Sequence, residues 1–293
     1  MSMVTIRHED LEATIDSMGA QLMSLKLDGG EYLWQGDKRW WSRRAPVLFP
    51  IVGCLRNDFA TSAQGDVRLK RHGIARLYDH EVASASEDAV TFRFASSDET
   101  RASFPYDFEL DMTYALSDRG LTQTFVVTNT GSVTLPFTLG GHPAFNIPIP
   151  GSDETFDEYE FRFARPWTAY TPAIDDAGIA DFGTTTLVVD DADVLPLSHE
   201  LIAHLLTITL LDVPDRTITL VGPHSGHGVT LDFAGFDYLG IWTAALDAPF
   251  VAIEPWRGCA TARDESDVFE DKRGTTILQP NETGRYSFDI RPF

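Results

Sequence analysis

Hydrophobic and polar residues alternate with a period of two along most of the chain. In residues 108–116 every second residue is hydrophobic, and the pattern resumes over residues 121–127 after the turn Asp118-Arg119-Gly120. Shorter runs of the same kind occur at residues 11–16, 229–233 and 286–290. Such alternation is typical of strands with one face in a core and the other in water. The pattern therefore predicts a chain built mainly of β-strands.

Turn-forming sequences separate the predicted strands, at Asp28-Gly29-Gly30, Glu87-Asp88 and Thr130-Gly131-Ser132. A helix is predicted only at residues 195–206, where leucines recur every four residues behind a capping residue, Ser198. One short helix does not supply the crossovers of a parallel α/β sheet. We therefore predict an all-β fold, a large antiparallel β-sandwich or barrel with at most one or two short helices. Residues 175–183 are predicted to form a long polar loop.

The chain shows no fixed-period repeat, low-complexity run or linker rich in Pro, Gly and Ser. Its 293 residues, 43% of them hydrophobic, are enough to bury a substantial core. We therefore expect residues 1–293 to form a single β domain. Such a fold does not by itself indicate a function.

The composition limits the classes of partner. The 44 acidic and 23 basic residues give a formal charge of −21, which argues against binding to nucleic acid. No stretch approaches the roughly 20 apolar residues of a membrane helix, and the first ten residues do not resemble a signal peptide. Cys54 and Cys259 are too few for a disulfide framework. We expect a soluble, cytoplasmic protein with reduced thiols.

Four segments interrupt the strand pattern with chemically active side chains, at residues 43–57, 70–76, 140–146 and 250–258. Glu254 is the most informative, because it ends the apolar run Phe250–Ile253. A carboxylate there is costly to desolvate unless it has partners or a catalytic task. Taken singly, His72, His142 and Arg56 also fit ordinary structural roles.

Taken together and in order, these segments resemble a known family. They contain A-P-V-L-F-P-I-V-G from Ala45, H-G-I-A-R from His72, G-H-P-A-F-N from Gly141 and E-P-W-R-G from Glu254. The ordered set is similar to the aldose 1-epimerase (galactose mutarotase) superfamily, in particular its LacX-like branch. The resemblance implies a β-supersandwich over nearly the whole chain. It also implies an enzyme that interconverts the α and β anomers of a free aldohexose without a cofactor.

The resemblance also implies roles for individual residues. His142 corresponds to the general acid, Glu254 to the general base, His72 to a sugar ligand near the ring oxygen and Arg56 to an arginine that binds sugar hydroxyls. Asn57, beside Arg56, is a further candidate for substrate binding. Aromatic faces for the apolar side of a pyranose are expected from Trp242, Phe145 and Trp256, which fit a hydrophobic core equally well.

The sequence departs from the family pattern at three positions. Pro143 follows the histidine, Trp256 stands in the E-P-Q segment, and Cys54 occupies a position where arginine is common. The departures indicate a changed specificity. The aspartate that galactose mutarotases use against sugar hydroxyls has no clear counterpart, and Asp232 and Asp247 are the candidates considered.

Two alternative functions stay open. One is a mutarotase for a phosphorylated hexose, whose phosphate would meet arginines of the first two segments: Arg43, Arg44, Arg71 and Arg76. The other is a carbohydrate-binding protein without catalysis. The partner expected in each case is a small sugar, and the chain is expected to be a monomer or homodimer.

Other enzyme classes find less support in the sequence. A glycosidase would need a second carboxylate in a comparable motif, and a serine hydrolase would need a G-x-S-x-G segment. His224 and His227, with His199 or Glu200 near them, have the residue types of a metal site. Their spacing and glycine-rich context indicate a turn, so no metal is predicted.

Overall fold

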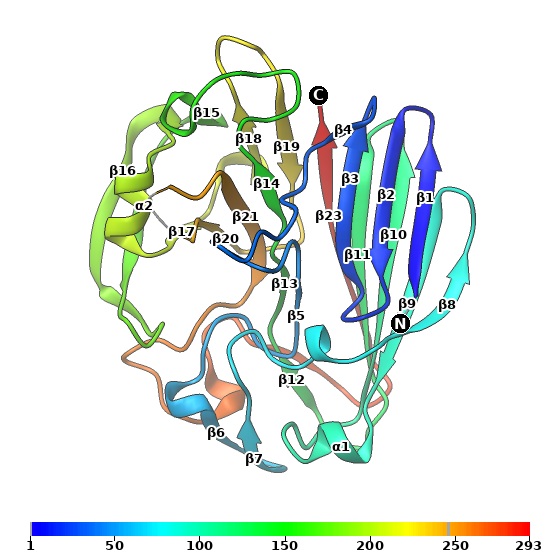
Figure 1. Cartoon of the computed structure of the whole chain (residues 1–293). Coiled ribbons are helices and arrows are strands. Elements are labelled where there is room, and N and C mark those ends of the chain that lie inside the picture. Colours follow the sequence, from blue (N-terminus) through cyan, green and yellow to red (C-terminus); the bar gives the residue numbers. More distant parts are fainter. Residues whose placement is uncertain (1, 245–246) are drawn as a thin grey trace.

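The computed structural model describes residues 2–244 and 247–293. These residues form antiparallel β-sheets and two short α-helices, α1 (Asp98–Arg101) and α2 (His199–Leu205), as Figure 1 shows. Single turns of 3₁₀-helix occur at Arg56–Asp58, Ala75–Leu77, Phe156–Glu158, Pro214–Arg216 and Phe269–Asp271. The predicted all-β class is confirmed, and α2 lies where the leucine pattern placed a helix. The Ser198 hydroxyl caps α2 by accepting a hydrogen bond from the Leu201 N–H at 3.3 Å.

The largest sheet has nine strands that pair antiparallel throughout. In spatial order they are β16 (Ala180–Pro196), β15 (Glu160–Ile174), β18 (Thr217–Val221), β19 (Gly228–Asp232), β23 (Thr283–Pro292), β11 (Gly120–Asn129), β10 (Phe108–Ser117), β9 (Ala89–Ala95) and β8 (Glu81–Ala85). The last strand of the chain, β23, therefore pairs between β19 and β11, in the middle of the sheet.

Smaller sheets complete the structure. The six-stranded sheet follows the order β17 (Ile208–Leu211), β20 (Tyr238–Trp242), β21 (Phe250–Arg257), β13 (Leu139–Gly141) and β5 (Val47–Leu48), with β14 (Ala144–Asn146) also paired to β21. A four-stranded sheet contains β1 (Met3–His8), β2 (Leu11–Asp16), β3 (Gln21–Leu27) and β4 (Gly30–Glu31). Two-stranded sheets pair β12 (Leu135–Phe137) with β22 (Thr276–Leu278) and β6 (Phe59–Ser62) with β7 (Gly65–Arg68).

The hairpin of β10 and β11 shows how the sequence pattern directs the fold. Pairing runs from Phe108 opposite Asn129 to Ser117 opposite Gly120. Every second residue of β10 from Phe108 onward is buried, as the alternation predicted. The buried side chains join a core that also takes residues of the six-stranded sheet, such as Val251 and Ile253. The two sheets thus pack on one common core.

The predicted loop at residues 175–183 is shorter in the structure than in the sequence-based prediction. Strand β15 continues to Ile174 and β16 begins at Ala180. Between them Asp175 Oδ1 accepts hydrogen bonds from the N–H groups of Ala177 and Ile179, at 3.0 and 2.9 Å. The side chain thus closes a tight turn, which lets the two strands pair almost to their ends.

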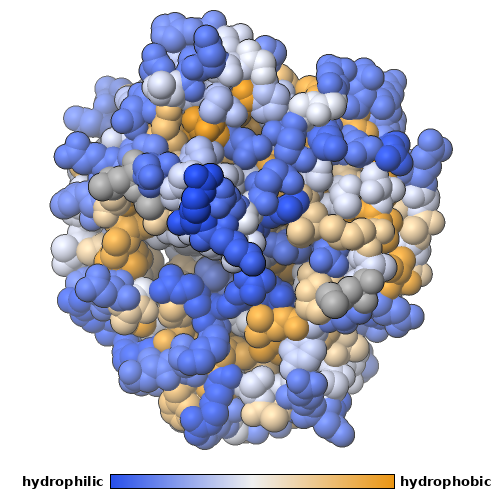
Figure 2. Space-filling view, viewed as in Figure 1, coloured by the Kyte–Doolittle hydropathy of each residue, from blue (hydrophilic) through white to orange (hydrophobic). Residues whose placement is uncertain are grey.

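In the view of Figure 1 the molecular surface is mostly hydrophilic, with smaller hydrophobic areas between the polar side chains (Figure 2). Across the described residues, no helix has the length and apolar character needed to cross a membrane.

Candidate active site

Strand β21 places Glu254 in a cavity because its two faces have different environments. All of its residues except Arg257 are buried. Val251 and Ile253 pack into the main core, whereas Phe250 and Trp256 belong to smaller clusters on the opposite face. Side chains of a strand alternate between its faces, so Glu254 shares the face of Phe250 and Trp256. Glu254 is 2% exposed and lines a cavity of about 230 Å³.

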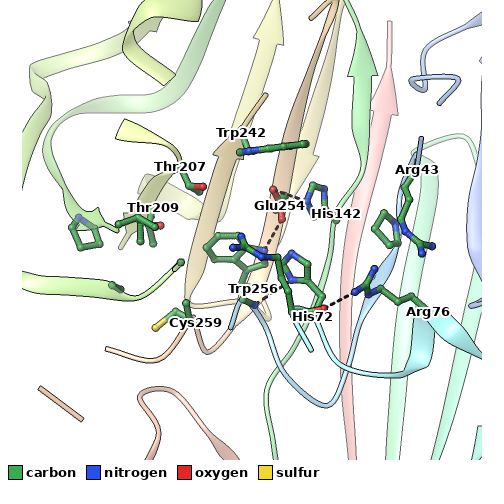
Figure 3. A pocket seen from close by; sticks show the side chains of 18 of the residues that line it. Arg43, His72, Arg76, His142, Thr207, Thr209, Trp242, Glu254, Trp256 and Cys259 are labelled. Atoms are coloured by element: carbon green, nitrogen blue, oxygen red, sulfur yellow. Dashed lines mark hydrogen bonds and ion pairs between the residues drawn. The ribbon is translucent and has the colours of Figure 1, made fainter. Parts of the chain in front are cut away.

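The neighbouring strands place His142 directly across from Glu254. In β13 Gly140 pairs with Trp256, and in β14 Ala144 pairs with Ala252. The register is the same on both sides of the break between β13 and β14, so His142 falls opposite Glu254. His142 Nε2 lies 3.2 Å from Glu254 Oε1, a contact that Figure 3 marks with a dashed line. Two segments more than 100 residues apart in sequence therefore create the contact.

The surroundings of this pair shield it from water. Trp41 stacks on the His142 ring with centroids 4.8 Å apart, and His72 and Trp242 each meet that ring edge-on at 5.5 Å. Burial raises the pKa of Glu254 well above its ordinary value and lowers the pKa of His142 to about 3. The low-dielectric site thus disfavours a charge on either group.

These pKa directions define what the pair can do chemically. A carboxylic acid beside a neutral imidazole has the same net charge as a carboxylate beside an imidazolium. A proton transfer within the pair converts one arrangement into the other without changing the charge of the site. The cavity therefore contains two groups in contact that can exchange a proton, since their polar atoms lie within the range for proton transfer.

A tight turn positions His72 at the cavity. The His72 N–H donates to the Gly53 carbonyl at 2.8 Å, and the Gly53 N–H donates to His72 Nδ1 at 3.2 Å. Because Nδ1 accepts a hydrogen bond, the neutral ring carries its proton on Nε2. Burial, followed by His142 and two nearby arginines, lowers the pKa of His72 well below its ordinary value. His72 is thus a neutral hydrogen-bond donor.

Two glycines make room for the indole of Trp256. A methyl group on Gly240 of β20 would overlap the Trp256 ring, and one on Gly140 of β13 would lie 2.8 Å from Trp256 Cδ1. The ring therefore lies close against both neighbouring strands. In this position Trp256 Nε1 donates a hydrogen bond to Glu254 Oε2 at 3.2 Å (Figure 3).

The opposite wall of the cavity comes from the hairpin of β15 and β16 and from the start of β17. Pro172 and Phe182 line it on the hairpin, Thr209 lines it within β17, and Thr207 lines it just before that strand. Sequence reasoning did not identify this wall, because nothing local distinguishes these residues from other strand residues. It also did not identify Trp41, which lines the cavity. The sequence feature that could have indicated it is its position two residues before the segment that begins at Arg43.

The structure brings some of the predicted site residues together but not all. Glu254, His142, His72 and Trp242 line one cavity. The Arg56 side chain instead forms an ion pair with Asp267 and donates to backbone carbonyls of the segment 262–265. Its guanidinium thus anchors a loop and is not among the groups that line the cavity.

Asn57 and Phe145 also lie outside the cavity lining. Asn57 is exposed in a 3₁₀ turn with a φ of 58°, so its position serves the turn that follows Arg56. Phe145 is 0% exposed, with its ring in the main core. The alternation along β14 explains this, because Phe145 pairs with the core-facing Val251 and therefore points away from the cavity.

Neither aspartate considered from the sequence lines this cavity. Asp247 Oδ1 accepts a hydrogen bond from Trp40 Nε1 at 2.9 Å and lines an adjoining hollow beside Trp242 and Thr207. Asp232 lies at the end of β19, opposite Asp289 of β23. Among the described residues that line the cavity, Glu254 is the one carboxylate.

The cysteines are free and buried, as expected from the sequence. Cys259 lines the cavity, and burial raises the pKa of its thiol to about 12. Burial also raises the pKa of Cys54. Both thiols are therefore protonated at neutral pH and unreactive as nucleophiles.

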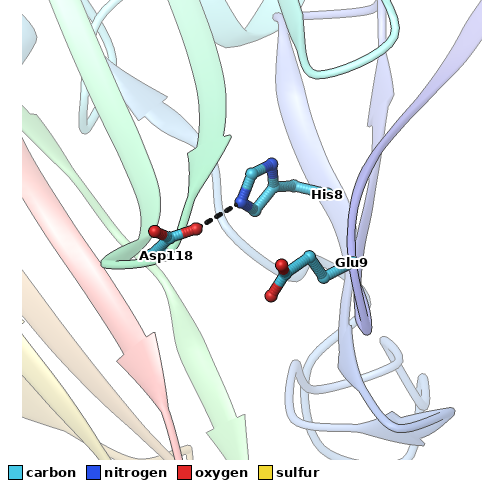
Figure 4. Close-up of side chains that lie close together, drawn as sticks. All are labelled: His8, Glu9 and Asp118. Carbon is cyan, nitrogen blue, oxygen red and sulfur yellow. Dashed lines mark hydrogen bonds and ion pairs between the residues drawn. The ribbon is translucent and has the colours of Figure 1, made fainter.

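Groups with the residue types of a metal site lie elsewhere. His8, Glu9 and Asp118 approach one another on the surface, where His8 Nε2 lies 2.6 Å from Asp118 Oδ1 (Figure 4). His199 Nε2 meets the Ala248 carbonyl at 3.0 Å, and the His224 N–H donates to Glu154. Over residues 2–244 and 247–293, neither histidine belongs to a set of three side chains placed to hold an ion.

Comparisons with known proteins agree over the full length of the chain. The family model described as aldose 1-epimerase matches residues 2–290. The chromosomal protein LacX of Lactococcus lactis subsp. lactis is 34% identical over 295 residues, with 98% of each chain covered.

Solved structures show the same fold. A galactose mutarotase-like protein from Lactobacillus casei ATCC 334 is 33% identical with a TM-score of 0.91, and the match covers 100% of both chains. A galactose mutarotase related enzyme from Lactobacillus acidophilus is 29% identical with a TM-score of 0.92, covering 100% of this chain and 97% of the other.

Proposed function

Because the chain belongs to the aldose 1-epimerase family, and is thus an isomerase acting on a sugar, we propose that it interconverts the α and β anomers of an aldohexose. In this proposal Glu254 is the general base and His142 the general acid. The observation that supports it most strongly is the 3.2 Å approach of His142 Nε2 to Glu254 Oε1, two buried groups in an aromatic-lined cavity.

The reaction requires two proton transfers at neighbouring oxygens. Glu254 removes the proton of the C1 hydroxyl while His142 delivers a proton to the ring oxygen, and the C1–O5 bond breaks to give the open-chain aldehyde. Rotation about the C1–C2 bond presents the other face of the carbonyl. The transfers then run in reverse, and the ring closes as the other anomer. Atoms and protons balance without a redox partner, so the proposed reaction needs no cofactor.

The geometry of the pair suits this sequence of steps. The two sugar oxygens are bonded to the same carbon, so a neighbouring acid and base such as His142 and Glu254 can reach both of them. The ring opening starts from carboxylate and imidazolium and ends with carboxylic acid and neutral imidazole. The buried site favours the second arrangement, and the net charge is the same throughout. Each positioned proton-transfer group typically contributes about 10²–10⁴-fold to a rate.

His72 and the aromatic residues have supporting roles in this proposal. His72 offers its Nε2–H as a hydrogen-bond donor to a sugar oxygen. Trp41 and Trp242, which pack against His142, provide apolar faces for the C–H side of a pyranose and exclude water from the reacting atoms.

Saturation-transfer NMR on equilibrated anomers of glucose and galactose tests the proposal. We expect anomer exchange that increases in proportion to enzyme concentration and far exceeds the rate in buffer. Binding of the sugars, detected by line broadening or calorimetry, without any such exchange would contradict the proposal. That outcome would favour a carbohydrate-binding protein that lacks turnover.

A further inference from the structure

The cavity that contains Glu254 and His142 is also lined by three arginines, Arg43, Arg71 and Arg76. They come from two segments, one before β5 and one in the turn that contains His72. Figure 3 shows Arg43 and Arg76 near each other on one side of the cavity. In a protein with a formal charge of −21, such a concentration of positive charge around one cavity needs a physical reason.

These guanidinium groups lie close enough for their charges to repel one another. Burial lowers the pKa of Arg76, and the charges of Arg43 and Arg71 lower it further. Arg76 Nη2 donates to the Arg71 carbonyl at 2.7 Å, while its buried Nε has no hydrogen-bond partner among the described residues. A buried donor without a partner is costly unless water or a ligand satisfies it.

Carboxylates do not neutralise this group. Elsewhere in the molecule arginines commonly pair with acids, as Arg93 does with Asp111 at 2.7 Å and Arg101 with Asp107 at 2.6 Å. Within the described part of the chain, Arg43, Arg71 and Arg76 form no ion pair with any carboxylate. Arg43 and Arg76 are half-buried and Arg71 is exposed, so the three charges offer a site to an anion from solution.

The fourth arginine considered from the sequence has a different position. Arg44 Nη1 donates to Gln35 Oε1 at 2.7 Å and to the Met23 carbonyl, so the side chain is held against β3 and does not line the cavity.

The position of the Arg71 guanidinium is limited by Gly178. A methyl group on Gly178 would lie 2.8 Å from Arg71 Nη2, so the hairpin turn packs directly on that guanidinium.

We propose that the substrate is an aldose phosphate, whose phosphate group binds to Arg43, Arg71 and Arg76 while its C1–O5 unit meets Glu254 and His142. This inference rests on the proposed function and adds the substrate class to it. Three guanidinium groups match the charge of nearly −2 and the several acceptor oxygens of a phosphate monoester better than the single charge of a carboxylate. The phosphate must be at a position other than C1, because ring opening requires a free C1 hydroxyl.

Comparison of charged and neutral sugars tests the inference. Anomer exchange by saturation-transfer NMR gives kcat/KM for glucose and galactose, their 6-phosphates, and glucuronic and galacturonic acids. We expect at least one 6-phosphate to exceed its neutral parent by about tenfold or more, and its KM to rise with salt as a charge interaction requires. Calorimetric titration with the same compounds measures binding independently of turnover.

Matched variants locate the effect. In Arg76→Met and in Arg71→Met the ratio of kcat/KM for the phosphate over the neutral sugar should fall about tenfold or more. Arg119→Met is the control, because it removes the same charge at the exposed turn between β10 and β11, where Arg119 does not line the cavity. It should leave both values unchanged.

The outcomes separate this inference from the proposed function. Equal turnover of neutral and phosphorylated sugars, with the ratio unchanged in the arginine variants, would overturn the phosphate assignment and leave the mutarotase assignment intact. Preference for a uronic acid would overturn it in favour of a carboxylate. Tight, salt-sensitive binding of a 6-phosphate without any exchange would support the anion site and contradict the proposed function. Exchange of no sugar and binding of no phosphate would overturn both.

Discussion

Trp256 donates a hydrogen bond from its indole Nε1 to Glu254 Oε2, two residues away on the same face of β21, at 3.2 Å. This contact favours the ionised carboxylate and so opposes the effect of burial, which raises the pKa of Glu254. Trp256 stands where the E-P-Q pattern of the family has glutamine, and its indole N–H donates a hydrogen bond to the proposed base. Gly240 and Gly140 supply the space for its ring.

The first prediction concerns Trp256→Phe. Loss of the donor should raise the pKa of Glu254 further, so the limb of the kcat pH profile that reports ionisation of the base should move to higher pH. At neutral pH we expect kcat to fall about tenfold, as for the loss of a hydrogen bond to a charged group. The pH profile of anomer exchange measures this. An unchanged limb, with kcat lowered equally at all pH values, would contradict the assigned effect of the indole.

The second prediction concerns stability in Glu254→Gln. Burial raises the folded-state pKa of Glu254 above the unfolded value of about 4.3, so between the two values the folded protein keeps a proton that the unfolded chain releases. The free energy of unfolding of the wild type therefore falls as the pH rises through that window. The glutamine variant has no such cost. Its Tm should exceed that of the wild type by about 2 °C or more at neutral pH.

Thermal unfolding of both proteins from pH 4 to pH 8 checks this sign. The advantage of Glu254→Gln should be smallest at pH 4 and grow toward neutral pH. Glu158→Gln is a suitable control, since this exposed carboxylate has a lowered pKa from its hydrogen bonds to Thr155. Its substitution should not produce a stability advantage that grows with pH. A wild type that becomes more stable than Glu254→Gln as the pH rises would contradict the assigned pKa direction.

The third prediction concerns Arg56→Ala. The structure gives Arg56 the role of holding the 262–267 segment through its ion pair with Asp267 and its carbonyl contacts. We expect the variant to lose about 1–3 kcal/mol of stability, while the KM for the sugar changes less than threefold. Chemical denaturation and the exchange assay measure the two effects. A large rise in KM without a loss of stability would restore the sugar-binding role that the family resemblance implied.

The fold was largely predictable because it follows from local alternation. The period of two over residues 108–116 predicted β10 with its buried face, and the spaced leucines predicted α2. The turn at residues 175–179 was harder to predict, because a single side chain, Asp175, closes it where the composition resembles that of a long loop.

The candidate site was predictable only where a residue's own segment determines its direction. Glu254 could be identified because it ends an apolar run, and His142 because of its motif. Arg56 was assigned by correspondence alone, and its direction depends on a loop more than 200 residues later in the sequence. Phe145 lies on the core-facing side of β14. Which side of β14 faces the cavity depends on its pairing with β21. Long-range register of this kind cannot be read from one segment.

The most direct measurement is the anomer exchange rate of Glu254→Gln beside the wild type, on the best substrate among glucose, galactose and their 6-phosphates. Glutamine keeps the shape of the side chain but cannot accept the proton from the C1 hydroxyl, so the variant should bind the sugar and lose about 10²–10⁴-fold in kcat. Folded Glu254→Gln with wild-type kcat would contradict the assignment of Glu254 as the base, and with it the central role of the His142–Glu254 pair.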